Sequence, residues 1–268
     1  FNAVNLEMVR GVIKAAEITK SPLILCHAEV HFPITPIECI APIMVSEASR
    51  AKVPVALLLD HGVTFSAIIK AMHLGFNAVM FDGSKLTYEE NIQRSAEVVR
   101  IAHELNVDVE AELGCVTRPK SGGALGNDDD NAAHDASLLT DPGKVGEFVQ
   151  RTGVDALAVA IGTAHGIYTS KPKLDFERLA KIRGLSPVPL VLHGGSGLTD
   201  EQFRQCIAHG VSKINYYTAM ASKSGEDIGK LYSGGKKVFF HELLGPAIQS
   251  ICDDVVGAIR LFGSEGKA

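Results

Sequence analysis

An aspartate and a histidine stand side by side directly after three leucines, in the segment LLLDHG at residues 57–62. His165 and His193 also follow apolar runs, and each is followed by glycine. Three neutral imidazoles that leave one position open are a common ligand set of catalytic zinc sites. A lone histidine of this kind is usually structural, but three of them make His61, His165 and His193 candidate zinc ligands.

The glycines after two of these histidines suit an anion site. The sequence HGGSG at 193–197 and the pair His165–Gly166 can turn backbone N–H groups toward a phosphate. A helix predicted to begin near Thr199 would add the positive end of its dipole. Ordinary tight turns are the alternative interpretation of a lone GGSG.

Short apolar runs alternate with amphipathic stretches along the chain, which is typical of parallel strands buried on both faces and joined by helices. We predict strands at 21–26, 53–60, 77–82, 107–114, 154–162, 188–195 and 211–217. We predict helices at 6–18, 65–75, 88–105, 142–153, 175–185 and 199–210, with Asp141 and Thr199 as N-caps.

This alternation predicts an α/β protein, a (β/α)8 TIM barrel whose active site lies at the carboxyl ends of the strands. We expect residues 1–268 to form one domain. The eighth strand would precede Phe1, so the first strand is expected to be largely absent from the given chain. An open doubly wound sheet is the main rival, and it is weakened because no GxGxxG motif opens a helix.

A long segment rich in Gly, Asp and Asn, residues 115–142, breaks this alternation directly after a predicted strand. Loops of this length are usually functional or disordered. We predict a mobile active-site loop at about 115–141, because it emerges where the candidate ligands gather.

The composition argues against several classes of partner. The net charge is −5 and the lysines and arginines are scattered, so no nucleic-acid partner is expected. No apolar run reaches the ~18 residues of a membrane span, so no membrane partner is expected. The five cysteines form no CxxC pair, as in the reduced thiols of a cytoplasmic protein. Phe1 is not a natural start, and a targeting segment could precede it.

Five motifs occur in order along nearly the whole chain: LLLDHG, VEAELG, GTAHGIY, VLHGGSGL and KINYYT. With them the sequence resembles the class II, zinc-dependent ketose-bisphosphate aldolases of the fructose-bisphosphate and tagatose-bisphosphate type. The resemblance implies a (β/α)8 barrel that forms a homodimer or homotetramer. It also implies reversible cleavage of a phosphorylated sugar, a ketose 1-phosphate or 1,6-bisphosphate, to dihydroxyacetone phosphate and an aldehyde.

The resemblance assigns the metal ligands. His61, His165 and His193 match the ligands of the catalytic Zn²⁺, and Glu112, with Asp82, matches acidic positions near a secondary metal site. Zn²⁺ is therefore the expected cofactor, with a monovalent cation as a further candidate. A zinc ion at such a site acts as a Lewis acid and stabilises the enediolate that forms when the C3–C4 bond breaks.

The resemblance also assigns residues that act on the substrate. Asp60 matches the acid/base at the C4 hydroxyl, and its place beside a zinc ligand would put metal and base on one strand end. Asn215 matches the residue that steadies the enediolate, and Asn2 matches an Asn at the end of the first strand. The phosphate of dihydroxyacetone phosphate would be bound by Gly166, Gly194, Ser196 and Thr218.

Two departures from the family pattern concern the ends of the substrate. The long loop carries Lys120 near the place of the usual proton shuttle at C1, and one of Asp128–Asp130 is the candidate for that role. The region 234–249 lacks the usual arginine for the far phosphate, although Lys236 and Lys237 are nearby. A ketose 1-phosphate with an uncharged, sulfonated or deoxy far end is therefore an alternative substrate.

Two further departures lie near the expected site. Tyr216 and Tyr217 precede Thr218, where the pattern has a small or acidic residue. In HAEVHF, Ala28 replaces the usual serine, and the nearby Glu29 and His31 are extra polar groups or only part of a capped loop.

Three other functions compete with a zinc aldolase. A barrel metallohydrolase usually begins with an HxH pair on one strand, and no strand end has one. A non-catalytic aldolase-like subunit would be favoured by loss of the zinc ligands, which are all present. A Schiff-base aldolase needs a buried lysine, and Lys213 is the one candidate at a strand end.

Overall fold

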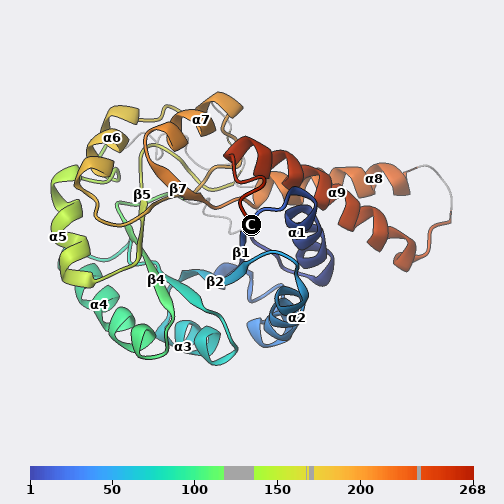
Figure 1. Cartoon of the computed structure of the whole chain (residues 1–268), viewed down its shortest axis with the longest axis horizontal. Helices are drawn as coiled ribbons and strands as arrows, with labels where there is room; N and C mark the ends of the chain where they lie inside the picture. The colour runs from blue at the N-terminus through green and yellow to red at the C-terminus, as the bar shows by residue number, and fades with distance from the viewer. Residues whose placement is uncertain (118–135, 167, 169–171, 234–236) are drawn as a thin grey trace.

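The computed structural model describes residues 1–117, 136–166, 168, 172–233 and 237–268. Within them, the chain forms a curved parallel sheet with helices around its outside (Figure 1). Most of the predicted loop at about 115–141 lies outside the described residues, and so do Lys120, Asp128–Asp130 and Lys236.

In the described part of the chain the sheet has seven strands, all parallel and paired in the order of the sequence. They are β1 (Leu23–Ala28), β2 (Val55–Gly62), β3 (Ala78–Phe81), β4 (Asp108–Leu113), β5 (Ala156–Val159), β6 (Leu190–Leu192) and β7 (Val211–Ile214). Each overlaps one predicted strand. A doubly wound sheet reverses its strand order at a switch point, and this sheet does not. The arrangement is therefore that of a TIM-barrel-like α/β fold.

The first three residues bridge the two outer strands of this sheet. The Cys26 N–H donates to the carbonyl oxygen of Phe1 at 2.8 Å, and the Ala3 N–H donates to that of Cys26 at 2.9 Å. On the other side, the Asn2 N–H donates to the carbonyl oxygen of Tyr216, just beyond β7, at 3.3 Å. Residues 1–3 thus connect β1 with the end of β7. That a first strand is largely absent from the chain stays a prediction.

Helices cover the outside of the sheet (Figure 1). They are α1 (Leu6–Thr19), α2 (Ile37–Arg50), α3 (Phe65–His73), α4 (Tyr88–Glu104), α5 (Pro142–Thr152), α6 (Phe176–Leu185), α7 (Asp200–Ala208), α8 (Thr218–Tyr232) and α9 (Phe240–Phe262), with a 3-10 turn at Glu29–His31. The predicted N-caps Asp141 and Thr199 are confirmed, since their side chains accept from the N–H groups of Gly143 and Gln202.

Three of these helices, α2, α8 and α9, were not predicted from the sequence. Pro42 inside α2 and Pro246 inside α9 indicate helix ends, because proline lacks an N–H donor. Gly225 and Gly229 lower the helix propensity of α8. Tertiary packing outweighs these local preferences against a helix. In α9, for example, Ile251 is buried against α1.

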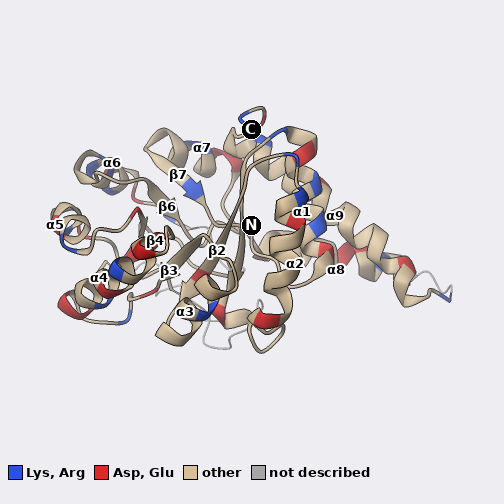
Figure 2. Cartoon of the chain, turned by 60° about the horizontal axis from the view of Figure 1, so that its bottom comes forward, with Lys and Arg blue, Asp and Glu red and all other residues tan. Residues whose placement is uncertain are grey.

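Positions of acidic and basic residues are interspersed along the outer helices (Figure 2). In the part of the chain that the structure describes, no helix has both the length and the apolarity needed to cross a bilayer.

Gly11 marks a close approach of α1 to α9. A Cβ atom at this position would lie 2.6 Å from the Cγ2 of Ile251 and 3.0 Å from the carbonyl oxygen of Ile248. Contacts this short leave no room for a methyl group, so the two helices would have to move apart to accept one.

We predict that Gly11→Ala lowers the free energy of unfolding by about 1–3 kcal/mol, because the added methyl overpacks the contact between α1 and α9. Gly257→Ala in α9 is the matched control, since no atom lies within 4 Å of its added Cβ. It should raise stability by up to about 1 kcal/mol through helix propensity. Urea unfolding followed by circular dichroism measures both, and equal stabilities would contradict the close packing.

Candidate active site

Strand β2 contains an irregularity where Asp60 and His61 stand. Its pairing with β3 shifts between Leu59 and Gly62, and His61 has a φ of 46°, in the left-handed region. In a regular strand, consecutive side chains point to opposite faces. The bulge changes this, and both Asp60 and His61 line the same cavity. A strained backbone conformation thus directs two adjacent side chains into the same cavity.

Three histidines on or beyond the ends of separate strands meet here: His61 and His165 line the cavity, and His193 is fully buried next to them. His61, His165 and His193 each offer a ring nitrogen, and these nitrogens all lie within 4.8 Å of one another. The ring centroid of His61 lies 4.8 Å from that of His165 and 4.5 Å from that of His193. Imidazoles so placed can bind one metal ion through one nitrogen each.

Carboxylates hold two of the three rings. The Nδ1 of His61 lies 2.8 Å from Asp82 Oδ2, and the Nε2 of His193 lies 2.8 Å from Glu110 Oε1. The Nδ1 of His193 is buried and has no hydrogen-bond partner among the described residues. Burial lowers the pKa of His193, aided by the positive charge of His61, so its imidazole is neutral. An oriented neutral imidazole with an unused buried nitrogen fits a metal ligand.

Glu112 lies behind His61 rather than on the cavity wall. Its Oε2 is 3.9 Å from the Nδ1 of His61, and its Oε1 accepts from the N–H of Val116 at 2.8 Å. With His61 and Asp82 it forms a second group whose candidate ligand atoms lie within 4.8 Å of one another. This neighbourhood fits a second metal position that shares His61 with the first.

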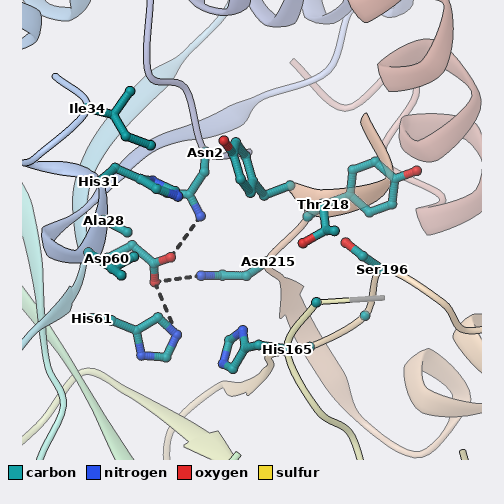
Figure 3. A pocket seen from close by; sticks show the side chains of 16 residues that line it. Asn2, Ala28, His31, Ile34, Asp60, His61, His165, Ser196, Asn215 and Thr218 are labelled. Carbon is teal, nitrogen blue, oxygen red and sulfur yellow. Dashed lines mark hydrogen bonds and ion pairs between the residues drawn. The ribbon is translucent and has the colours of Figure 1, made fainter. Parts of the chain in front are cut away.

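Asp60 is held by two amide side chains. Asn2 Nδ2 donates to its Oδ2 and Asn215 Nδ2 donates to its Oδ1, both at 2.8 Å (Figure 3). Burial alone would raise the pKa of Asp60, but the positive charges of His61 and Lys213 and the hydrogen bond from Asn2 outweigh it and lower the pKa well below its usual value. Asp60 is therefore a carboxylate with a fixed orientation, 3.9 Å from the Nε2 of His61.

A buried lysine connects this carboxylate to the histidine cluster. Lys213 Nζ donates to Glu110 Oε2 and to Asn215 Oδ1, each at 2.7 Å. Burial would lower the pKa of Lys213, but the charge of Glu110 raises it above its ordinary value, so the group is an ammonium. Hydrogen bonds thus run from His193 through Glu110, Lys213 and Asn215 to Asp60. From the sequence alone, Lys213 stands out only as a Schiff-base candidate.

Small residues and hydroxyls form the other end of the cavity. Gly166 and Gly194 adopt positive φ values of 86° and 71°, and a Cβ on Gly194 would lie 2.5 Å from the carbonyl oxygen of Ala164. Ser196 and Thr218 line this end beside them (Figure 3). Thr218 is also the first residue of α8, where backbone N–H groups attract anions.

Tyr168 braces the two glycine-containing loops of this end. Its hydroxyl donates to the carbonyl oxygen of Gly194 at 2.8 Å and accepts from the N–H of Ala164 at 2.7 Å. Burial raises the pKa of Tyr168 to about 12, so it stays a neutral donor. Tyr168 is the last residue of the motif GTAHGIY, and this place is the one signal in the sequence that could have indicated its role.

Comparison with known proteins decides the family. A family model described as "Fructose-bisphosphate aldolase class-II" matches residues 1–267. The chain belongs to the class II fructose-bisphosphate aldolase family. The fructose-bisphosphate aldolase of Geobacillus stearothermophilus is 38% identical over 274 residues, which cover 100% of this chain and 92% of the relative. Membership supports aldolase activity, a lyase reaction, for this chain.

Other members of the aldolase family match over a similar extent. The fructose-bisphosphate aldolase of Thermus caldophilus is 36% identical over 295 residues, covering 100% of this chain and 93% of the relative. The crystal structure of the YdjI aldolase from Escherichia coli K12 superposes with a TM-score of 0.85 at 36% identity, covering 100% of this chain and 91% of that one. The likeness therefore includes the whole barrel.

In this aldolase the fold gathers most of the predicted site residues around one cavity of about 230 Å³. The cavity is lined by Asn2, Asp60, His61, His165, Gly166, Gly194, Ser196, Asn215 and Thr218. Glu112 and His193 lie outside this lining. Glu29 also lies outside it, because its carboxylate accepts from the N–H groups of Val63 and Thr64. The capped-loop interpretation therefore holds for Glu29, while His31 lines the cavity.

We predict that His193→Ala lowers zinc affinity at least 100-fold, because it removes one of three convergent imidazoles. His73→Ala is the control, since His73 is an exposed histidine at the end of α3. Equilibrium dialysis of chelator-treated protein against buffered Zn²⁺, read by elemental analysis, gives both affinities. Full zinc occupancy of His193→Ala would remove this residue from the ligand set.

Proposed function

We propose that the protein catalyses the reversible, metal-dependent cleavage of a ketose 1-phosphate or ketose 1,6-bisphosphate to dihydroxyacetone phosphate and an aldehyde. The observation that carries the proposal is the buried, ionised Asp60 beside the three-histidine cluster, in a cavity whose other end suits a phosphate. The base, the metal ligands and the anion-binding residues therefore line or adjoin one cavity.

His61, His165 and His193 would hold a zinc ion, and Glu112 would take part in a second position next to it. The ion supplies a Lewis acid that stabilises the negative charge developing on the substrate oxygens. Asp82 and Glu110 fix the orientation of the His61 and His193 rings, which tightens metal binding.

Asp60 would take the proton from the C4 hydroxyl as the C3–C4 bond breaks. Its two bonds to Asn2 and Asn215 keep the carboxylate aimed into the cavity before substrate arrives, which lowers the cost of reaching the reactive geometry. The Oδ1 of Asn2 is buried without a hydrogen-bond partner among the described residues, so it can accept from a substrate hydroxyl.

Asn215 would donate to the enediolate. An amide nitrogen carries two N–H groups, and one of them is used on Asp60. Because Lys213 donates to its Oδ1, the amide cannot flip without losing a charge-assisted bond. The same ammonium, paired with Glu110, is a poor nucleophile, so a Schiff-base route through Lys213 is disfavoured.

The phosphate group would bind at Gly166, Gly194, Ser196 and Thr218. Backbone N–H groups at glycines with positive φ, two hydroxyls and the first turn of α8 are the donors that an oxyanion prefers. Since a Cβ on Gly194 would meet the backbone of Ala164, only glycine permits this approach of the two loops.

We also propose that the protein works in the cytoplasm as a homodimer or homotetramer. The helical hairpin of α8 and α9 extends beyond the barrel (Figure 1), and Phe239 and Phe240 near its tip are largely exposed. Exposed apolar residues grouped in this way are common where subunits meet.

We predict that zinc-loaded protein releases dihydroxyacetone phosphate from at least one member of a panel of ketose 1-phosphates and 1,6-bisphosphates. A coupled assay that reduces the released dihydroxyacetone phosphate at the expense of NADH measures the rate. EDTA should abolish it and added Zn²⁺ should restore it, because the metal stabilises the enediolate charge. Chelator-insensitive release would contradict metal dependence. No release from any substrate would contradict the proposal and favour a non-catalytic aldolase-like subunit.

We predict that Asp60→Asn lowers kcat about 10²–10⁴-fold with unchanged zinc content, because the amide cannot accept the C4 hydroxyl proton. Asp253→Asn, at an exposed carboxylate of α9, is the matched control and should behave as the wild type. Steady-state cleavage rates and elemental analysis of the same samples test this. Cleavage by Asp60→Asn at the wild-type rate would exclude Asp60 as the base.

A further inference from the structure

Two stretches that depart from the family pattern meet in the structure. His31 lies in the connection from β1 to α2, and Tyr217 lies between β7 and α8. Their ring centroids are 4.7 Å apart with an angle of 48° between the ring planes. Both residues line the cavity. We call these two residues the ring pair; they form one continuous wall from segments far apart in sequence.

His31 lies across the cavity from Ser196 and Thr218, and Tyr217, which directly precedes Thr218, reaches over to contact it. In Figure 3, Ser196 and Thr218 lie on one side, His31, Ile34 and Asp60 lie on the other, and Asn215 lies between them. A ketose whose C1 phosphate is bound at Ser196 and whose C4 hydroxyl is at Asp60 would direct its remaining carbons toward the side that carries His31. This wall would therefore contact the aldehyde half of the substrate.

The side chains around the ring pair are apolar. Ala28, Val30 and Ile34 line the cavity next to His31, and Ile34 is 67% exposed at its rim. Burial raises the pKa of Tyr217, so its ring is a neutral phenol. Among the described residues that line the cavity, none is a lysine or an arginine. A phosphate brought against such a wall would lose hydration without gaining a fixed cation, whereas C–H groups pack well on rings.

The segment that carries His31 is fixed in place. The buried His27 lies below it, with Nδ1 at 2.9 Å from the carbonyl oxygen of Ala3 and Nε2 at 3.0 Å from that of Thr35. Phe32 stacks on the His27 ring at an angle of 12°. Glu29 ties the start of the segment to the first turn of α3 through the N–H of Thr64. A wall held at both ends can discriminate between substrates, because it does not yield to a poor fit.

We propose that His31 and Tyr217 determine specificity for the aldehyde half and select a ketose 1-phosphate whose far end carries no charge. This inference rests on the proposed function. The two ends of the substrate would contact different parts of the cavity. The phosphate would bind at Ser196 and Thr218, and an uncharged hydroxylated chain would pack against the ring pair. The aldehyde product would then carry no phosphate.

The test compares matched pairs of substrates that differ only in the far phosphate, such as fructose 1-phosphate and fructose 1,6-bisphosphate, and likewise for tagatose and sorbose. For at least one pair, the zinc-loaded wild type should have a kcat/KM at least tenfold higher for the 1-phosphate. His31→Ala and Tyr217→Ala should each lower this kcat/KM about tenfold, mainly through KM, because contacts of one side chain in a pocket have this magnitude. Tyr217→Phe keeps the ring and should therefore retain the wild-type preference for the 1-phosphate.

A charge introduced at the rim makes the test sharper. Ile34→Lys should shift the ratio of kcat/KM values toward the bisphosphate about tenfold, because an ammonium would face the far phosphate. Ile18→Lys is the matched control, since Ile18 is an exposed residue of α1 outside the cavity lining, and it should leave the ratio unchanged. Ile34 is largely exposed, so this variant does not depend on repacking the core.

A second readout separates this inference from the proposed function. Exchange of a hydroxymethyl hydrogen of dihydroxyacetone phosphate with solvent deuterium, followed by NMR, needs the metal, the phosphate site, Asn215 and the base that acts at that carbon, but not the aldehyde half of the site. Two outcomes would overturn the inference and leave the proposed function standing. In the first, the wild type catalyses exchange and cleavage but prefers bisphosphates. In the second, the ring-pair variants affect both substrate classes equally. Absence of both exchange and cleavage in the zinc-loaded wild type would overturn both.

Discussion

The left-handed backbone conformation of His61 is the constraint on which the site depends. It lets β2 deliver Asp60 and His61 to one cavity, although a regular strand would separate them onto opposite faces. The bulge is held in place because His61 bonds to Asp82 and Asp60 bonds to two amides. Strain at this position is thus offset by hydrogen bonds that also orient the reactive groups.

Buried charge is the second organising feature. Asp60, Glu110 and Lys213 lie inside the barrel, where an unpaired charge would be strongly destabilising. They are connected through Asn215, so each charge has a partner of opposite sign or an amide donor. Because the network joins β2, β4 and β7, removal of one member affects the orientation of the others. Local geometry at the metal ligands therefore depends on strands from across the whole sheet.

Much of the fold could be predicted from the sequence. Seven strands and six helices follow from runs of apolar residues and from caps such as Thr199, which are local properties. Helices α2, α8 and α9 were missed. Pro42 and Pro246 indicate helix ends locally, and two glycines weaken α8, while the packing of residues such as Ile251 decides otherwise. The bridge made by residues 1–3 was missed too, since its partners on β1 and beyond β7 are distant in sequence.

The sequence by itself determined the residue types of the site and their place at strand ends, since strand ends are local and parallel strands bring their carboxyl ends to one edge. It could not determine that Lys213 would pair with Glu110 rather than act as a nucleophile, because 103 positions separate them. The contact between His31 and Tyr217 could not be predicted from the sequence either, since it depends on the curvature of the sheet, which places β1 near β7. Tertiary structure decided these contacts, because the curvature of the sheet brings its first and last strands to either side of residues 1–3.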